Sequence, residues 1–167
     1  MDMRKFNVIK WSQSIKNEFF RKKFLDFALT YGIPFNMGMG LTIDELTEKV
    51  CIIKSPAKYR RRNHIGTAHA ISQALLGEYA AGLSISQKFD FENYRYVITN
   101  LNINYHKPGT GTLTGKCNAP EAWPDLSCGE GFAEMFAEIK NEKGELVSDV
   151  KTTWQIKSWS KTKKKPS

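Results

Sequence analysis

One run of the sequence, residues 69–82, limits the folds open to this chain more than any other. Apart from the histidine at its start, this run carries one charged side chain, Glu78, among Ala, Gly, Leu, Ile, Ser, Gln and Tyr. A mainly apolar run of this length is typical of a buried helix, and we expect the helix to span about residues 68–83.

Small residues recur along one side of the predicted helix, which makes that side nearly smooth. They are Ala70, Ala74, Gly77 and Ala81. A glycine inside a helix costs about 1 kcal/mol relative to alanine, and close approach of another backbone is the usual reason for one. We therefore expect a β-sheet to lie against this side of the helix.

The adjoining side of the helix places Glu78 in line with Ile71, Leu75 and Gly82. Burial among apolar neighbours would raise the pKa of the Glu78 carboxyl group unless a cation pairs with it. Two interpretations follow: a functional carboxylate, or a carboxylate neutralised by an arginine or lysine from elsewhere in the chain.

The residues before the helix are suited to a turn and a helix start. Asn63, Gly66 and Thr67 are turn and capping residue types. The first turn of a helix leaves backbone amides unpaired, and such an end can hold an anion or a polarised carbonyl group. His69 lies at the positive end of the helix dipole, which favours its neutral form, and it is either a capping or core histidine or a catalytic one.

Composition limits the domain count and the partners. With 167 residues, of which 41% are hydrophobic, the chain can build one core, and we expect a single domain over residues 1–160. The net charge of +8 is localised, because residues 54–62 and 157–167 each hold five positive charges and no negative one. Aromatic residues interleave with neither segment as a stacking platform would require, so nucleic acid is not an expected partner. The basic end, residues 161–167, is expected to be disordered.

The spacing of cysteines and histidines gives no sign of a metal site. Cys51, Cys117 and Cys128 are odd in number and form no CxxC pair, so reduced thiols are expected. His64 and His106 have no partners at metal-ligand spacing. The sequence has no signal-peptide-like start and no run of 18 apolar residues, so we expect a cytoplasmic protein without a membrane partner.

The remaining segments predict one more helix and a set of strands. Residues 12–31 predict an N-terminal amphipathic helix with aromatic residues at helical spacing, namely Phe20, Phe24, Phe27 and Tyr31. Residues 39–44 and 50–53 predict a first antiparallel pair. After the central helix, one face of a long alternating strand carries Val97, Thr99, Leu101, Ile103 and Tyr105. Three strands follow, the last two joined by a hairpin turn at residues 141–144. This order predicts an α+β fold in which a curved antiparallel β-sheet wraps around one central buried helix.

The spacing of Asn63, His69 and Glu78 resembles a motif of the hotdog-fold acyl-CoA thioesterases of the phenylacetate-pathway type, and the chain is also similar to the small hotdog proteins related to them. In that motif an Asn, a helix-starting His-Gly-Gly and an acidic residue on the central helix keep fixed separations. The element order matches over about residues 25–157. Two departures stand out: Ala70 and Ile71 replace the two glycines, and the acidic residue is Glu instead of Asp.

The resemblance implies a thioester hydrolase. The thioester carbonyl would lie at the N-terminus of the central helix, polarised by the Ala70 amide. Glu78 would act as general base towards a water, with a role as nucleophile as the weaker alternative. Asn63 would orient the water or the carbonyl, and His69 is the remaining catalytic candidate. The substrate-binding candidates are Gly66, Thr67, Ile71, Arg60, Arg61, Arg62 and Lys107.

The basic candidates have two interpretations: arginines that hold the phosphates of coenzyme A, or a solvated loop. Coenzyme A would be part of the substrate, and no other cofactor is implied. Two subunits commonly share one site in such proteins, so we expect a homodimer, with a tetramer of two dimers as a larger form. A non-catalytic hotdog protein that binds acyl-CoA or fatty acyl ligands is the alternative function, because Ile71 adds bulk where the thioester would approach. A hotdog dehydratase is a weaker alternative, since its histidine signatures are missing.

Overall fold

The computed structural model describes residues 8–161. The helices are α1 (Val8–Gln13), α2 (Glu18–Gly32) and α3 (Ala70–Lys88), with short 3-10 turns at Pro34–Asn36, Tyr59–Arg61 and Trp159–Lys161. The strands are β1 (Thr42–Leu46), β2 (Val50–Ser55), β3 (Tyr94–Tyr105), β4 (Leu113–Asn118), β5 (Glu130–Lys140) and β6 (Leu146–Ser158).

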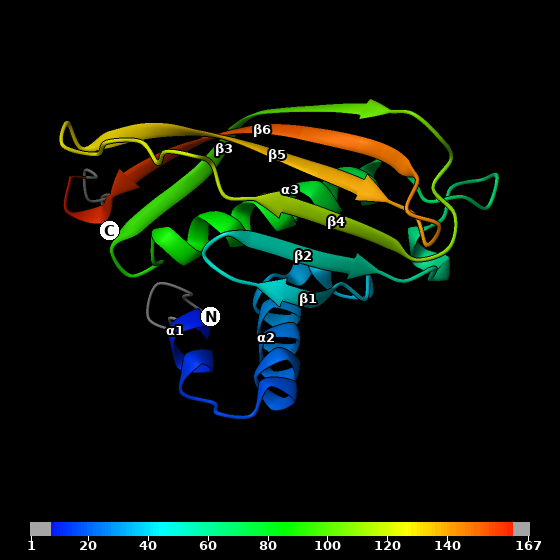
Figure 1. The fold of residues 1–167 in the computed structure, drawn as a ribbon, viewed down its shortest axis with the longest axis horizontal. Coiled ribbons are helices and arrows are strands. Elements are labelled where there is room, and N and C mark those ends of the chain that lie inside the picture. Colours follow the sequence, from blue (N-terminus) through cyan, green and yellow to red (C-terminus); the bar gives the residue numbers. More distant parts are fainter. Residues whose placement is uncertain (1–7, 162–167) are drawn as a thin grey trace.

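The strands form one antiparallel sheet that curves around α3 (Figure 1). Its order is β1-β2-β4-β5-β6-β3, so β1 and β3 are the two edges. The predicted α+β arrangement, a curved sheet around one buried central helix, is confirmed. The central helix runs to Lys88, about one turn beyond the predicted end.

The smooth side of α3 lies against the sheet, as predicted. A β-carbon added at Gly77 would lie 2.5 Å from Cγ2 of Val150 on β6, which is too close for any side chain. On the facing strand β4, a β-carbon at Gly115 would lie 2.8 Å from Cγ of Leu76. Two glycines, one on each layer, therefore let the helix and the sheet approach each other closely.

The adjoining side of α3 is not covered by the sheet. Ile71 is 58% exposed, and Leu75 and Glu78 are half-buried. The edge strand β3 also leaves apolar side chains open to solvent, with Leu101 at 40% and Tyr105 at 47% exposure. Within residues 8–161, the start of this helix side is thus open to solvent, and the outer edge of β3 has no strand paired with it.

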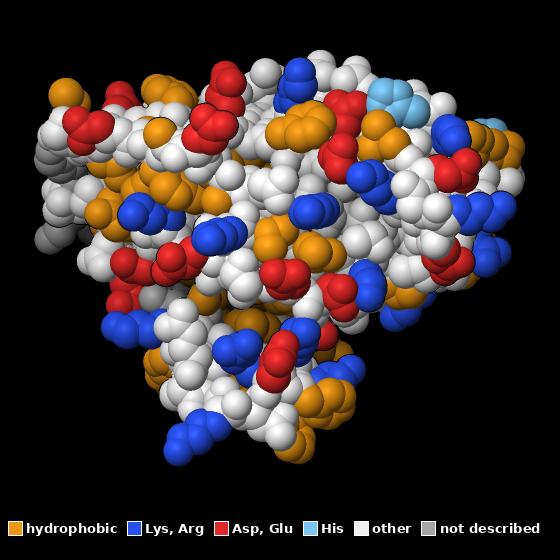
Figure 2. All heavy atoms as spheres, viewed as in Figure 1, with side chains coloured by type: hydrophobic (Ala, Val, Ile, Leu, Met, Phe, Trp, Pro, Cys, Tyr) orange, Lys and Arg blue, Asp and Glu red, His pale blue; other side chains and the backbone are white. Residues whose placement is uncertain are grey.

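The N-terminal helix differs from the prediction of a single helix over residues 12–31. The chain forms two helices, because the side chain of Asn17 caps a new helix by accepting hydrogen bonds from the amides of Phe19 and Phe20 at 3.0 and 3.3 Å. The buried residues of α2 are Leu25 and Leu29. Of the predicted aromatic side, Phe24 packs against the core, whereas three members face solvent: Phe20, Phe27 and Tyr31. Figure 2 shows hydrophobic side chains on the surface of this protruding part.

The long strand β3 contains an irregularity that simple alternation did not predict. Its register with β6 shifts between Ile98 and Asn100, so Thr99 is an extra residue in the strand. Ile98 lies opposite Trp154, and Tyr96 lies opposite Ile156. Both β6 residues are buried, so Tyr96 lies on the helix side of the sheet, and the uninterrupted alternation predicted from Val97 to Tyr105 was wrong for the first half of the strand.

Two sequence expectations concern membranes and the chain end. No helix among the described residues is long and apolar enough to cross a membrane. Of the predicted disordered tail, residues 162–167 lie outside the described part of the chain.

The three cysteines, Cys51, Cys117 and Cys128, are free thiols, as predicted.

Candidate active site

The turn before α3 is built by the side chain of Asn63. Its Oδ1 accepts hydrogen bonds from the amides of Ile65 and Thr67, both at 3.1 Å, and its Nδ2 donates to Oγ1 of Thr67 at 2.9 Å. Gly66 completes the turn with a φ of 82°. In the single subunit, therefore, the Asn63 side chain is engaged in its own turn, and it positions the residues that lead into the helix.

His69 caps the helix. Its Nδ1 accepts a hydrogen bond from the amide of Ile71 at 3.1 Å, and its own amide donates to the carbonyl of Arg61 at 2.7 Å. The His69 side chain therefore satisfies one of the backbone amides that the first turn of a helix leaves unpaired.

The amide of Ala70 is the open donor at the helix start. Ala70 is the first residue of α3 and is exposed, and its N–H has no acceptor among residues 8–161. Its carbonyl accepts a hydrogen bond from the hydroxyl of Tyr105 at 3.0 Å, which ties the end of β3 to the start of α3. The helix N-terminus can therefore offer one directed N–H to an oxygen that carries negative charge.

Glu78 lies on the uncovered side of α3, half-buried. Burial raises the pKa of its carboxyl group, and neither an ion pair nor a hydrogen bond reaches the carboxylate from the described residues. The interpretation that an arginine or lysine neutralises it is thus not supported within this part of the chain. A buried carboxylate without a partner is costly, and such groups gather at functional sites.

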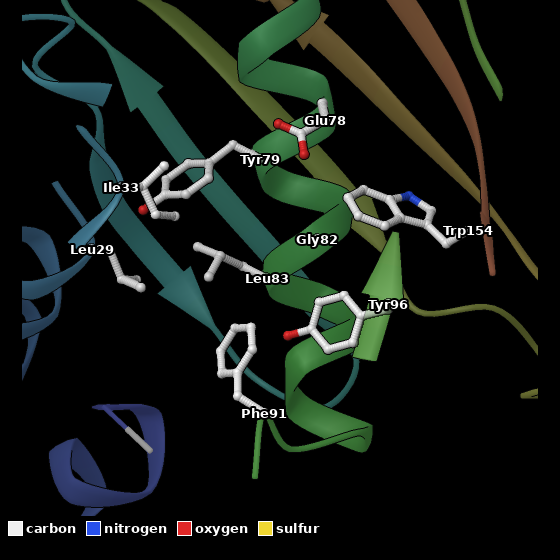
Figure 3. A pocket seen from close by; sticks show the side chains of 9 residues that line it. All are labelled: Leu29, Ile33, Glu78, Tyr79, Gly82, Leu83, Phe91, Tyr96 and Trp154. Atoms are coloured by element: carbon white, nitrogen blue, oxygen red, sulfur yellow. The ribbon is translucent and has the colours of Figure 1, made fainter. Parts of the chain in front are cut away.

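A cavity of about 210 Å³ opens beside Glu78 (Figure 3). Glu78 is the single charged residue among those that line it, and the rest of the lining is Leu29, Ile33, Tyr79, Gly82, Leu83, Phe91, Tyr96 and Trp154. These residues come from α2, the turn after α2, α3, the connection to β3, β3 and β6.

The separation of Ala70 and Glu78 restricts what one subunit can do alone. Glu78 follows Ala70 by eight positions on one continuous helix. At about 1.5 Å per residue, the two lie about 12 Å apart along the axis. A carbonyl held by the Ala70 amide is therefore out of reach of Glu78 in the same chain.

The predicted phosphate-binding residues differ in their surroundings. Arg61 is 3% exposed, and its Nη2 donates a hydrogen bond to the carbonyl of Gly111. For this arginine, burial thus fits neither a solvated loop nor a surface contact with phosphate. Burial, with the neighbouring charge of Arg62, lowers the pKa of Arg61. Lys107 is paired with Glu145 at 2.9 Å. Arg60 and Arg62 are exposed.

Other relevant residues were not singled out from the sequence. Tyr105 was assigned only to one face of a long strand, although its hydroxyl donates a hydrogen bond to the carbonyl of Ala70 at the start of α3. His106, expected to have a surface or packing role, contacts Oδ2 of Asp149 at 2.6 Å through Nε2, and Asn104 donates to Oδ1 at 2.9 Å. Burial raises the pKa of the Asp149 carboxyl group, but the hydrogen bonds with Asn104 and His106 lower it by more, so the pKa lies below its usual value. No group of three or more metal-ligating side chains lies together within residues 8–161.

Comparison with solved structures finds proteins of the same fold. A thioesterase of Haemophilus influenzae superposes with a TM-score of 0.67 at 19% identity, over 82% of this chain and 90% of that one. A mutant thioesterase of Staphylococcus aureus superposes with a TM-score of 0.65 at 19% identity, over 75% of this chain and 99% of that one. A Pseudomonas aeruginosa protein of unknown function, named a probable thioesterase, superposes with a TM-score of 0.72 at 19% identity, over 81% of this chain and 95% of that one.

These similarities show that the chain has the hotdog fold that the sequence motif had indicated. No curated protein sequence matches the chain. A family model matches residues 21–156, and its description is domain of unknown function, DUF4442. The matched residues span most of the described part, from within α2 to near the end of β6. The chain therefore belongs to the DUF4442 family of hotdog-fold proteins.

Proposed function

We propose that this protein is a thioester hydrolase that acts on acyl-CoA, with the site shared between two copies of the chain. The observation that carries the proposal is Glu78: a half-buried carboxylate without a partner among the described residues, at the wall of an apolar cavity. A carboxyl group with a raised pKa is closer to the working range of a general base at neutral pH. The thioesterase names of the structural neighbours support the same chemistry.

In the proposed reaction, Glu78 removes a proton from a water as the water oxygen attacks the thioester carbonyl. Negative charge develops on the carbonyl oxygen, and the amide of Ala70 donates a hydrogen bond to it. One such donor is worth about 3 to 4 kcal/mol in the transition state. The C–S bond then breaks, the coenzyme A thiolate takes up the proton, and the products are a carboxylic acid and coenzyme A.

A homodimer supplies what one subunit lacks. Within one chain Glu78 is about 12 Å from the Ala70 amide, so the donor must come from a second copy. The uncovered side of α3 and the edge strand β3 are the surfaces available to that copy, and both expose apolar residues such as Ile71 and Leu101. Symmetric pairing of two edge strands removes an exposed sheet edge, a known liability of single sheets.

The remaining site residues have supporting roles in this proposal. Asn63 and Gly66 shape the turn, Thr67 is held by Asn63, and His69 fixes the first turn of the helix. The exposed Arg60 and Arg62 are the cations proposed for the phosphates of coenzyme A. Arg61 instead holds the loop at Gly111 in place.

The test is release of free thiol from acyl-CoA substrates. Glu78→Gln keeps the shape and removes the basicity, and we expect hydrolysis to fall at least a hundredfold, as for loss of a general base. Glu134→Gln is the matched control, because Glu134 is an exposed carboxylate on the outer side of β5. Hydrolysis that survives in Glu78→Gln at the wild-type rate would refute the role of Glu78.

Binding without turnover is the second candidate function. The observation that favours it is Ile71, whose side chain is 58% exposed at the helix start, where the resembling family has a glycine. If the wild-type protein binds acyl-CoA with saturation but releases no thiol, this candidate is correct. In that case Ile71→Gly is the variant in which hydrolysis should appear.

A further inference from the structure

The cavity beside Glu78 has a continuous aromatic wall. The rings of Phe91 and Tyr96 lie 5.2 Å apart between centroids, and those of Tyr96 and Trp154 lie 6.2 Å apart. In Figure 3 Glu78 lies at one end of the cavity, and Phe91 and Tyr96 lie at the other. A ligand that enters beside the carboxylate would therefore extend along α3 into apolar surroundings.

The opposite wall comes from the N-terminal helix and the turn after it. Leu29 of α2 is 1% exposed, and Ile33, the residue after the helix, is 37% exposed. Both line the cavity, whereas the N-terminal half of α2 protrudes away from the sheet (Figure 1). The end of α2 is thus a wall made by a segment outside the curved sheet and its central helix.

Apart from Glu78, the lining offers no charged group to a ligand. Burial raises the pKa of Tyr79 and of Tyr96, so both phenols stay neutral at neutral pH. Leu29, Ile33 and Leu83 complete a surface that suits hydrocarbon.

The volume of the cavity sets the size of the ligand. An apolar cavity of about 150 Å³ holds one benzene molecule, which has six carbon atoms. By proportion, the volume of about 210 Å³ found here has room for about eight carbon atoms.

We propose that this cavity binds the acyl group of the substrate, that it takes a compact apolar group of about eight carbon atoms, and that Leu29 and Ile33 limit the length it accepts. The proposal rests on the proposed function, since it assigns the acyl specificity of the same site. Both a chain of eight carbons and a single aromatic ring with a short linker satisfy these dimensions.

The test uses S-alkyl coenzyme A thioethers, because they have no carbonyl to hydrolyse and so report binding apart from chemistry. Isothermal titration calorimetry on the full chain would compare butyl, hexyl, octyl, dodecyl and hexadecyl thioethers, with S-phenethyl coenzyme A as the aromatic probe. We expect the affinity to rise about fourfold per added methylene up to octyl, the equivalent of ~0.8 kcal/mol per buried methylene, and then to level off. An affinity that keeps rising to hexadecyl, or that is already level from butyl, would overturn the proposal.

Variants of the wall locate the binding. Ile33→Phe fills the cavity at a partly exposed position and should move the plateau to shorter chains, by about two carbon atoms. Leu29→Ala removes three carbon atoms from the wall and should move it by about three in the other direction. Phe20→Ala is the matched control, because Phe20 is on the same helix but is 63% exposed and outside the cavity lining.

Leu29→Ala empties a buried position, so its folding is checked by thermal melting, and Ile33→Phe carries the test if that variant fails to fold. An unchanged plateau in Ile33→Phe would overturn the assignment of the wall.

Hydrolysis of the matching acyl-CoA esters separates this proposal from the proposed function. Thiol release that depends on Glu78, with a chain-length profile that Ile33→Phe does not alter, would overturn the cavity assignment and leave the hydrolase intact. The opposite result is an affinity for the thioethers that levels off at octyl and shifts in the wall variants, without thiol release from any ester. It would support the cavity assignment and refute the hydrolase. The two failures therefore give different results.

Discussion

Replacing Gly77 by alanine should destabilise this protein, although alanine is the better helix former. The gain in helix propensity is about 1 kcal/mol. Against it, the new β-carbon would lie 2.5 Å from Cγ2 and 2.7 Å from Cβ of Val150, a side chain that is 1% exposed in the middle of the sheet. Overpacking costs about 1 to 3 kcal/mol, and contacts this short belong at the upper end. The expected net loss in the free energy of unfolding is about 2 kcal/mol.

The second variant in this argument is Val150→Ala. Alone it removes buried methyl groups and leaves a cavity, at a cost of about 2 kcal/mol. In that background Gly77→Ala no longer meets the Cγ atoms, but Cβ of residue 150 still lies 2.7 Å from the new β-carbon, so the loss should fall from about 2 to about 1 kcal/mol. The same substitution should thus cost less in the Val150→Ala background, with a coupling of about 1 kcal/mol.

Urea denaturation of the four proteins of this cycle measures these free energies. All four are compared at one protein concentration, because association adds to the apparent stability. Gly82→Ala is the control on the same helix, where the nearest side-chain atom, in Trp154, lies 3.3 Å from an added β-carbon, so the loss should be smaller. Additive effects, or a Gly77→Ala protein more stable than wild type, would show that close approach to Val150 is not the reason for this glycine.

Four further predictions concern the site. Glu78→Gln should raise the free energy of unfolding at neutral pH, because burial raises the folded-state pKa of Glu78 above its unfolded value near 4.5 and wild type therefore loses stability as pH rises through the folded-state pKa. In urea denaturation at a series of pH values, the difference in free energy of unfolding between the variant and wild type should be gone well below pH 4.5. His69→Ala should cost about 1 kcal/mol by loss of the helix cap, and His69→Asn should restore it. Ala70→Pro should keep the fold by circular dichroism but lose hydrolysis, since proline is tolerated at the first helical position and the residue before it is already extended, with φ −60° and ψ 142°. Arg60→Ala with Arg62→Ala should raise the Michaelis constant at low salt and much less at high salt, and no change at low salt would refute the phosphate contact.

The central helix and its contact with the sheet could be predicted because both depend on local pattern. An apolar run with small residues at helical spacing permits few arrangements, and Gly77 does lie where the sheet approaches. The hairpin turn ending at Gly144, with φ 77°, is likewise set by local chemistry. The order of elements along the chain then predicted the curved sheet.

Features that depend on distant partners were not predictable in the same way. The capping role of Asn17 splits the N-terminal segment into two helices, a signal outweighed by the continuous aromatic spacing. One extra residue at Thr99 reverses the facing of half a strand without any change in apolar content. The burial of Arg61 follows from its contact with Gly111, fifty residues along the chain.

The residues of the candidate site were named from the sequence, but its walls were not. His69, Ala70 and Glu78 were named from resemblance to a family motif, and the structure places Ala70 and Glu78 on α3 and His69 at its N-cap. The cavity beside Glu78 needs Leu29 and Trp154, which come from the two ends of the chain. No local pattern relates such residues, so only the folded chain shows that they meet.

The spacing of Ala70 and Glu78 along α3 has a consequence for mixtures of inactive variants. If each site takes its amide from one chain and its carboxylate from the other, a mixed dimer of Ala70→Pro and Glu78→Gln has one site with both defects and one with none. Co-refolding equal amounts of the two inactive proteins should give half mixed dimers, and so about a quarter of the wild-type rate. Two copies, each silent alone, would thus complement one another.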